Sequence, residues 1–178
     1  MGTAAELNHF LADVEKRAFA MARMSVGNAD DALDIVQDVM MTLARRYSDK
    51  PAGEWRPLFY RMLRNRITDF HRKQTLRGRL FGWFQASEDG GDDLENAPGS
   101  GIEKPDRKLA SLQLGERIEL ALAALPDRQR EAFVLRAWEG LDVRATAAAM
   151  GCSEGSVKTH YSRAVHQLRE LLEDMTDG

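Results

Sequence analysis

The chain has 178 residues, of which 43% are hydrophobic and 30% charged, and its formal net charge is −3. This balance is typical of a globular protein, and the net negative charge argues against a protein that coats nucleic acid regardless of sequence. The apolar runs are too short to span a bilayer, no secretory signal is recognisable and one cysteine excludes an internal disulfide framework, so we expect a cytoplasmic chain without membrane insertion.

Apolar residues at helical spacing predict three or four helices in the first part of the chain. The first contains a stripe made of Leu7, Phe10, Leu11, Val14, Ala18 and Met21. The segment "VGNADD" supplies a break and N-cap candidates before a second helix over about residues 31–47. "SDKPAGEW" breaks the pattern again, and a third helix is expected after Pro57.

Charge is segregated around the middle of the chain. Residues 55–79 hold eight Lys and Arg against one acid, whereas residues 86–106 hold seven acids against one base. The basic block points to an anionic partner. The acidic block is rich in Gly, Pro and Ser and has almost no large apolar residue, which predicts a flexible linker. We therefore expect a helical domain at 1–79, a linker at 80–107 and a second helical domain at 108–178.

Beyond the linker the pattern is again helical. A helix over 109–125 stops at "LPDRQ", where Pro126 suits the first turn of the next helix, "REAFVLRAW". "EGL" ends that helix, and the short helix "DVRATAAAM" leads through "MGCS" into a final helix over about 154–174. A glycine turn between two such helices is the signature of a helix-turn-helix. The predicted fold class is all-α, with two small helical domains.

The final helix has a buried seam and a polar face. Val157, Tyr161, Ala164 and Leu168 follow at spacings of four, three and four. The residues that lie off this seam or border it, where a recognition helix meets base edges, are Lys158, Thr159, His160, Ser162 and Arg163. Ser153 is a candidate N-cap. The last helix of a bundle has the same spacing, so the pattern alone leaves the choice open; the glycine turn and the preceding short helix favour DNA binding.

Two stretches resemble a known family. "ALPDRQREAFVLRAWEGLDVRATAAAMGCSEGSVKTHYSRAVHQLREL" is similar to the region-4 domain of bacterial RNA polymerase sigma factors of the extracytoplasmic-function (ECF) class. "DDALDIVQDVMMTLARRY" and "WRPLFYRMLRNRITDFHRK" are similar to the family's region-2 domain. The resemblance implies a promoter-specificity subunit, without enzymatic activity or cofactor, that binds core RNA polymerase and promoter DNA. The family usually has an anti-sigma factor too; the sequence leaves its existence open.

The resemblance also implies three sets of site residues. The set for docking on core polymerase is Asp34, Ile35, Gln37, Asp38 and Met41. The set for the single-stranded −10 element is Ser48, Asp49, Lys50, Glu54, Trp55, Arg61, Arg64, Asn65, Arg66, Arg72 and Lys73. There cations track phosphates and aromatic rings can stack on bases, although Phe59 and Phe70 fit a core better. The set for the duplex −35 element is Ser153, Ser156, Lys158, Thr159, His160, Ser162 and Arg163.

Other interpretations remain at this stage. A helix-turn-helix regulator that is not a polymerase subunit expects an α/β receiver domain in place of the N-terminal helices. A metal-dependent nuclease could use Asp30, Asp31, Asp34 and Asp38, but no histidine is spaced to complete such a site, so we expect no metal. His160 stands where the family frequently has arginine. The apolar residues Leu80, Phe81, Trp83 and Phe84 favour packing within the chain over a seam that is buried by an anti-sigma protein or by the two domains closing together.

Overall fold

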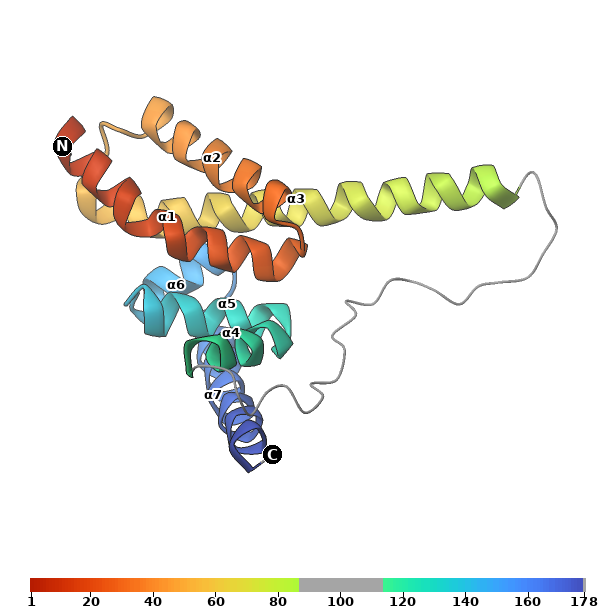
Figure 1. Ribbon diagram of the computed structural model, residues 1–178. Helices are drawn as coiled ribbons and strands as arrows, with labels where there is room; N and C mark the ends of the chain where they lie inside the picture. Colours follow the sequence, from red (N-terminus) through yellow and green to blue (C-terminus); the bar gives the residue numbers. More distant parts are fainter. Residues whose placement is uncertain (87–113, 178) are drawn as a thin grey trace.

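The computed structural model describes residues 1–86 and 114–177, and every regular element in these ranges is a helix (Figure 1). The N-terminal helices are α1 (Ala4–Val26), α2 (Ala29–Arg46) and α3 (Ala52–Ala86). The C-terminal helices are α4 (Leu114–Ala124), α5 (Asp127–Phe133), a π-helical segment (Val134–Trp138), α6 (Val143–Met150) and α7 (Glu154–Asp177). The predicted all-α class is confirmed. The acidic stretch from residue 87 onward lies outside the described residues.

Local capping explains where α1 and α2 begin and end. Thr3 and Glu6 form a reciprocal capping box at the start of α1. Gly27, with a φ of 77°, ends α1 in the left-handed conformation that glycine adopts without strain. Asn28 then caps α2 by accepting hydrogen bonds from the backbone N–H groups of Asp30 and Asp31. The break predicted at "VGNADD" is therefore confirmed.

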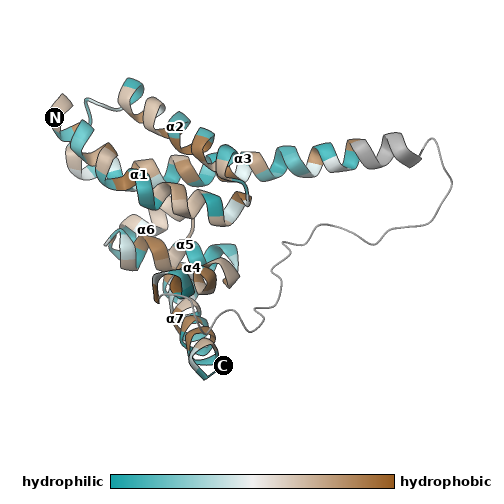
Figure 2. Cartoon of the chain, viewed as in Figure 1, coloured by the Kyte–Doolittle hydropathy of each residue, from teal (hydrophilic) through white to brown (hydrophobic). Residues whose placement is uncertain are grey.

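The third helix differs from the prediction at both ends. It begins at Ala52 rather than after Pro57, so Pro57 lies inside the helix and leaves one backbone hydrogen bond unmade there. It also continues past residue 79 to Ala86, so residues 80–86, which we had placed in the linker, are helical. The later part of α3 projects from the bundle, and before its grey end many of its residues are hydrophilic, coloured teal (Figure 2). Leu80 is half exposed, and the side chains of residues 81–86 are outside the description.

The two halves of the chain share one hydrophobic core, with α6 packed against α3. The buried residues that it takes from α3 are Trp55, Phe59, Tyr60, Leu63 and Ile67. Those from the C-terminal half are Ala132, Val134, Leu135, Leu141, Ala147, Ala149, Met150 and Val157. A separate cluster, Ala121, Leu122, Leu125, Ala164 and Leu168, joins α4 to α7. Two regions predicted as separate domains therefore pack face to face.

The helix-turn-helix consists of α6 and α7. Asp142 caps α6 by accepting from the Ala145 N–H, and Gly151, with a φ of 63°, ends it. Ser153 caps α7 through its Oγ, which accepts from the Ser156 N–H at 3.1 Å. The predicted seam of α7 is confirmed at Val157, Ala164 and Leu168, which are buried; Tyr161 is half-buried and stacks on Phe133.

Candidate functional site

One face of α2 is open and partly apolar. Asp34, Gln37 and Asp38 are exposed there, Ile35 is half-buried, and Met41 keeps 49% of its surface exposed. Leu33 is also exposed on this face, with 41% of its surface open to solvent. The spacing of four from Leu33 through Gln37 to Met41 was the signal that could have found it. An exposed apolar pair rimmed by carboxylates is a surface suited to docking a protein.

The carboxylates of α2 do not form a metal site. Among the residues that the structure describes, no three His, Cys, Asp or Glu side chains are grouped to hold an ion. Asp38 instead forms an ion pair with Arg66 of α3, at 2.6 Å, with both side chains about half exposed. The arrangement gives no support to a metal-dependent nuclease.

The loop before α3 is exposed, but Trp55 is not. Ser48, Asp49, Lys50 and Glu54 face solvent. Trp55 is 1% exposed, and its indole N–H donates to the Tyr47 carbonyl at 3.0 Å. Gly2 lies against its ring so closely that a Cβ there would sit 2.1 Å away. The prediction that Trp55 stacks on a base is wrong for this arrangement, because the ring has no open face.

A strip of polar residues remains open along α3. Arg61, Asn65 and Arg72 are exposed and follow at spacings of four and seven, with Arg66 and Lys73 beside them. The aromatic rings Phe59 and Tyr60 are buried among the core residues, as expected for Phe59; Phe70 is half-buried. Such a strip can track a phosphate backbone without a stacking platform.

Arg64 differs from the rest of the strip because the C-terminal half covers it. Its Nε lies 3.3 Å from Glu131 Oε1, and a Cβ added at Gly151, in the turn of the helix-turn-helix, would lie 3.4 Å from its Nη1. Arg128 also pairs with Glu131 and donates to the Met150 carbonyl. Burial raises the pKa of Glu131 to about 7, although Arg64 and Arg128 act in the opposite direction.

The polar face of α7 is available to a ligand. Lys158, Thr159, Ser162 and Arg163 are exposed, and His160 is half-buried at the edge of the same face. Ser153 Oγ caps α7 by accepting from the Ser156 N–H, and it also donates to Ser156 Oγ at 2.9 Å. The cations therefore lie on the first turns of α7, where a helix inserted into a major groove contacts base edges.

Family models match both halves of the chain. "Sigma-70 region 2" matches residues 9–77, and "Sigma-70, region 4" matches residues 115–168. No helix in the described parts of the chain has the length and apolar character needed to cross a membrane.

Individual proteins that are similar to the chain are sigma factors as well. The chain is 32% identical to the RNA polymerase sigma-E factor of Streptomyces antibioticus, with 94% of this chain and 87% of that protein covered. It is 31% identical to the ECF RNA polymerase sigma factor EcfG of Rhodopseudomonas palustris, with 88% and 78% covered. Among solved structures it is similar to the sigma factor RpoE of Bartonella quintana in complex with the anti-sigma factor NepR, with a TM-score of 0.60, 28% identity, and 93% and 96% covered.

Proposed function

We propose a division of labour between the two halves of this chain, which belongs to the extracytoplasmic-function class of the sigma-70 family of RNA polymerase sigma factors. The chain is a promoter-specificity subunit that acts with core RNA polymerase and promoter DNA, and it is not an enzyme. This membership sets aside a helix-turn-helix regulator that works apart from the polymerase. The family-model matches fall in the proposed domains 1–79 and 108–178, joined by 80–107.

The open face of α2 docks on core polymerase in this proposal. The observation that supports it is the exposure of Met41 and Leu33 in the middle of a polar rim. A few side chains near the centre of a protein interface supply most of its affinity, while the surrounding residues exclude water. The contact set is Asp34, Ile35, Gln37, Asp38 and Met41, to which the structure adds Leu33.

The loop before α3 and the polar strip bind the −10 element. Flipping a base out of the duplex costs a few kcal/mol. With Trp55 buried, hydrogen bonds from the loop and phosphate contacts from the strip must offset that cost. The loop set is Ser48, Asp49, Lys50 and Glu54, and the strip set is Arg61, Asn65, Arg66, Arg72 and Lys73, with Arg64 added once the C-terminal half moves away from it.

The exposed face of α7 reads the −35 element as duplex DNA. Each good contact between a side chain and a base edge contributes roughly 1–3 kcal/mol of discrimination. Lys158, Thr159, Ser162 and Arg163 supply the main contacts, His160 a peripheral one, and Ser153 and Ser156 present the helix N-terminus to a phosphate. We place the chain in the cytoplasm, where it meets polymerase. The likeness to the NepR-bound sigma factor supports an anti-sigma protein as a further partner.

Transcription reconstituted in vitro tests the proposed function. Purified chain added to bacterial core polymerase should start transcription at a defined site of a promoter mapped by overexpression, whereas core polymerase alone should not. The start site should depend on both promoter elements. If the folded chain shows no association with core polymerase, the proposed function fails.

Two alanine variants should separate the α2 face from the α7 face. Arg163→Ala should weaken discrimination between the correct −35 element and a scrambled one by roughly 1–3 kcal/mol and leave the affinity for core polymerase unchanged. Met41→Ala should weaken the affinity for core polymerase and leave −35 discrimination unchanged, because it removes an exposed apolar contact and no DNA contact. Each variant is the control for the other, measured by core-binding titration and by promoter competition. Equal losses of both affinities in either variant would contradict the division of labour.

A further inference from the structure

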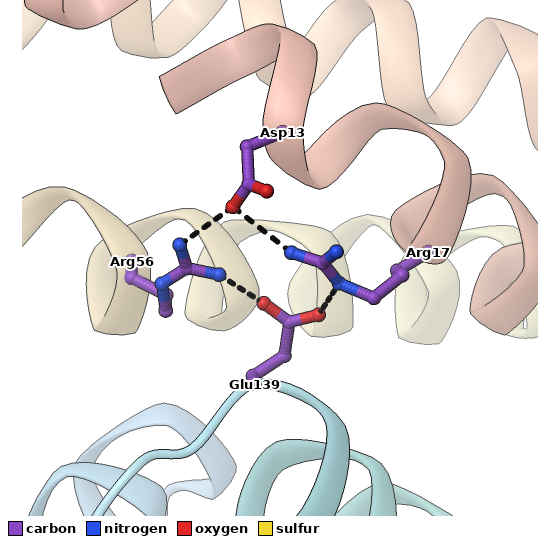
Figure 3. Close-up of polar contacts among 4 residues, drawn as sticks. All are labelled: Asp13, Arg17, Arg56 and Glu139. Atoms are coloured by element: carbon purple, nitrogen blue, oxygen red, sulfur yellow. Dashed lines mark hydrogen bonds and ion pairs between the residues drawn. The ribbon is translucent and has the colours of Figure 1, made fainter. Parts of the chain in front are cut away.

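Four side chains of alternating charge form a ring between the two halves of the chain (Figure 3). Asp13 and Arg17 come from α1, Arg56 comes from α3, and Glu139 comes from the turn after the π-helical segment. Arg17 Nε donates to Glu139 Oε1 at 2.5 Å, and Arg56 Nη1 donates to Glu139 Oε2. Asp13 closes the ring at 3.0 Å from Arg17 and 2.8 Å from Arg56.

Glu139 is the one member of this ring that the C-terminal half contributes. Its side chain is fully buried, whereas the two arginines are 33% and 28% exposed. The backbone around it is fixed, because its N–H donates to the Val134 carbonyl and Gly140 follows with a φ of 66°. The bonds to Glu139 raise the pKa of Arg17, and those to Arg56 and Arg17 lower the pKa of Asp13. Asp13, Arg17 and Arg56 therefore stay charged at neutral pH.

The arrangement in which the two halves of the chain pack on each other is called closed here. It brings the two proposed DNA-contacting surfaces close together. Gly151 lies against Arg64, and α7 starts three residues later. From Arg64 to Arg163 the path through the turn and along α7 is at most about 30 Å, from the reach of an extended chain and the helical rise. The −10 and −35 elements lie about 25 base pairs apart, which is about 85 Å of duplex. The closed chain cannot contact both elements at once.

Polymerase docking does not meet the same obstacle. Helix α2 lies on the side of α1 and α3 away from α5, α6 and α7 (Figure 1). Leu33 and Met41 are exposed in the closed arrangement. To contact both promoter elements, the chain must break the interface between its halves. That interface consists of the shared core, the Arg64–Glu131 pair and the ring around Glu139.

We infer that Glu139 is a latch that holds the free chain closed, with its two promoter-contacting surfaces unable to act together. This inference rests on the proposed function. Opening leaves Arg17 and Arg56 with Asp13 alone and exposes a carboxylate that is fully buried in the closed state. Removing one partner of a buried ion pair is strongly unfavourable to the arrangement that buries it. The latch therefore sets how much of the free chain is open and competent for a promoter.

The test compares Glu139→Gln with the wild-type full-length chain. The variant keeps the shape of the side chain and removes its charge, so the ratio of closed to open chain should fall about tenfold, less than for a fully buried pair because both arginines are partly exposed. Small-angle scattering of the free chain should then give a larger radius of gyration. Where closed chain predominates, the concentration that gives half-maximal transcription with core polymerase should fall by a similar factor, since apparent affinity scales with the competent fraction.

Two further variants keep the result interpretable. Glu170→Gln makes the same change on an exposed face of α7, where the carboxylate pairs with His166, and should alter neither measurement. Arg17→Gln removes a partner of Glu139 on the N-terminal half and should change both measurements as Glu139→Gln does. It replaces Glu139→Gln in the test if that buried substitution prevents folding. If a folded Glu139→Gln or Arg17→Gln variant has an unchanged radius of gyration, the inference is overturned. It is also overturned if the radius of gyration rises but the concentration for half-maximal transcription does not fall. If wild-type chain directs no transcription, the proposed function fails instead, while scattering still decides whether Glu139 holds the chain closed.

Discussion

Replacing Trp55 by alanine is expected to lower the free energy of unfolding by about 3–5 kcal/mol, which is a large part of what a domain of this size has. The indole is 1% exposed, contacts Phe10 at a ring-centroid distance of 5.9 Å, and donates to the Tyr47 carbonyl. Alanine leaves a cavity in the shared core and removes the indole hydrogen bond to the Tyr47 carbonyl, which keeps its bond from the Lys50 N–H. Urea unfolding followed by helical circular dichroism measures the change.

Two companion variants distinguish a core residue from a DNA contact. Arg61→Ala removes an exposed cation, so it should change stability by less than about 0.5 kcal/mol and weaken binding of single-stranded −10 DNA. Trp55→Phe keeps an aromatic ring but loses the bond to Tyr47, so its stability should fall between that of the wild type and that of Trp55→Ala. If Trp55→Ala unfolded like the wild type and lost only DNA binding, Trp55 would be a stacking residue after all.

The contrast between these residues shows which parts of the fold are local enough to predict. The two ends of α1 and the start of α2 follow from Thr3, Gly27 and Asn28, which act on backbone groups two to four residues away. The start of α3 is not predictable from Pro57, because proline favours a helix start and here lies inside the helix, five residues after it begins. The burial of Trp55 was missed because it depends on Gly2, distant in sequence and close in space.

Some residues of the candidate site were likewise predictable from the sequence, and others were not. The exposed face of α7 was predictable, because the seam at Val157, Ala164 and Leu168 fixes by helical geometry which residues point away from it. The state of Arg64 was not predictable, because its partner Glu131 belongs to the other half and no local pattern links them. The same holds for Glu139 and its two arginines. Contacts between separately patterned regions are set by tertiary packing, which spacing within one helix does not encode.

The stability of the closed chain should decrease as the pH rises from about 4.5 to about 7, through the titration of Glu131. This carboxyl lines a cavity of about 250 Å³ between the halves, with Arg64, His71, Asp127 and Arg128 around it. Burial raises its pKa from 4.5 to about 7 in the folded chain. Below the unfolded pKa the group is protonated in both states and costs nothing. Between the unfolded and the folded pKa, the unfolded chain has lost a proton that the folded chain still holds. Stability therefore falls as the pH rises through this range, and it stops falling above the folded pKa.

Glu131→Gln isolates this contribution from the other groups that titrate in the same range. The variant resembles the protonated carboxyl, so it should match the wild type near pH 4.5 and exceed it in stability at about pH 8. The difference should approach about 3 kcal/mol, from the size of the pKa shift. Urea unfolding of both chains across this range, analysed as a difference at each pH, gives the measurement. A variant that is less stable than the wild type at about pH 8 would mean that the ion pairs of Glu131 with Arg64 and Arg128 outweigh its burial, and that the pKa in the folded chain lies below 4.5.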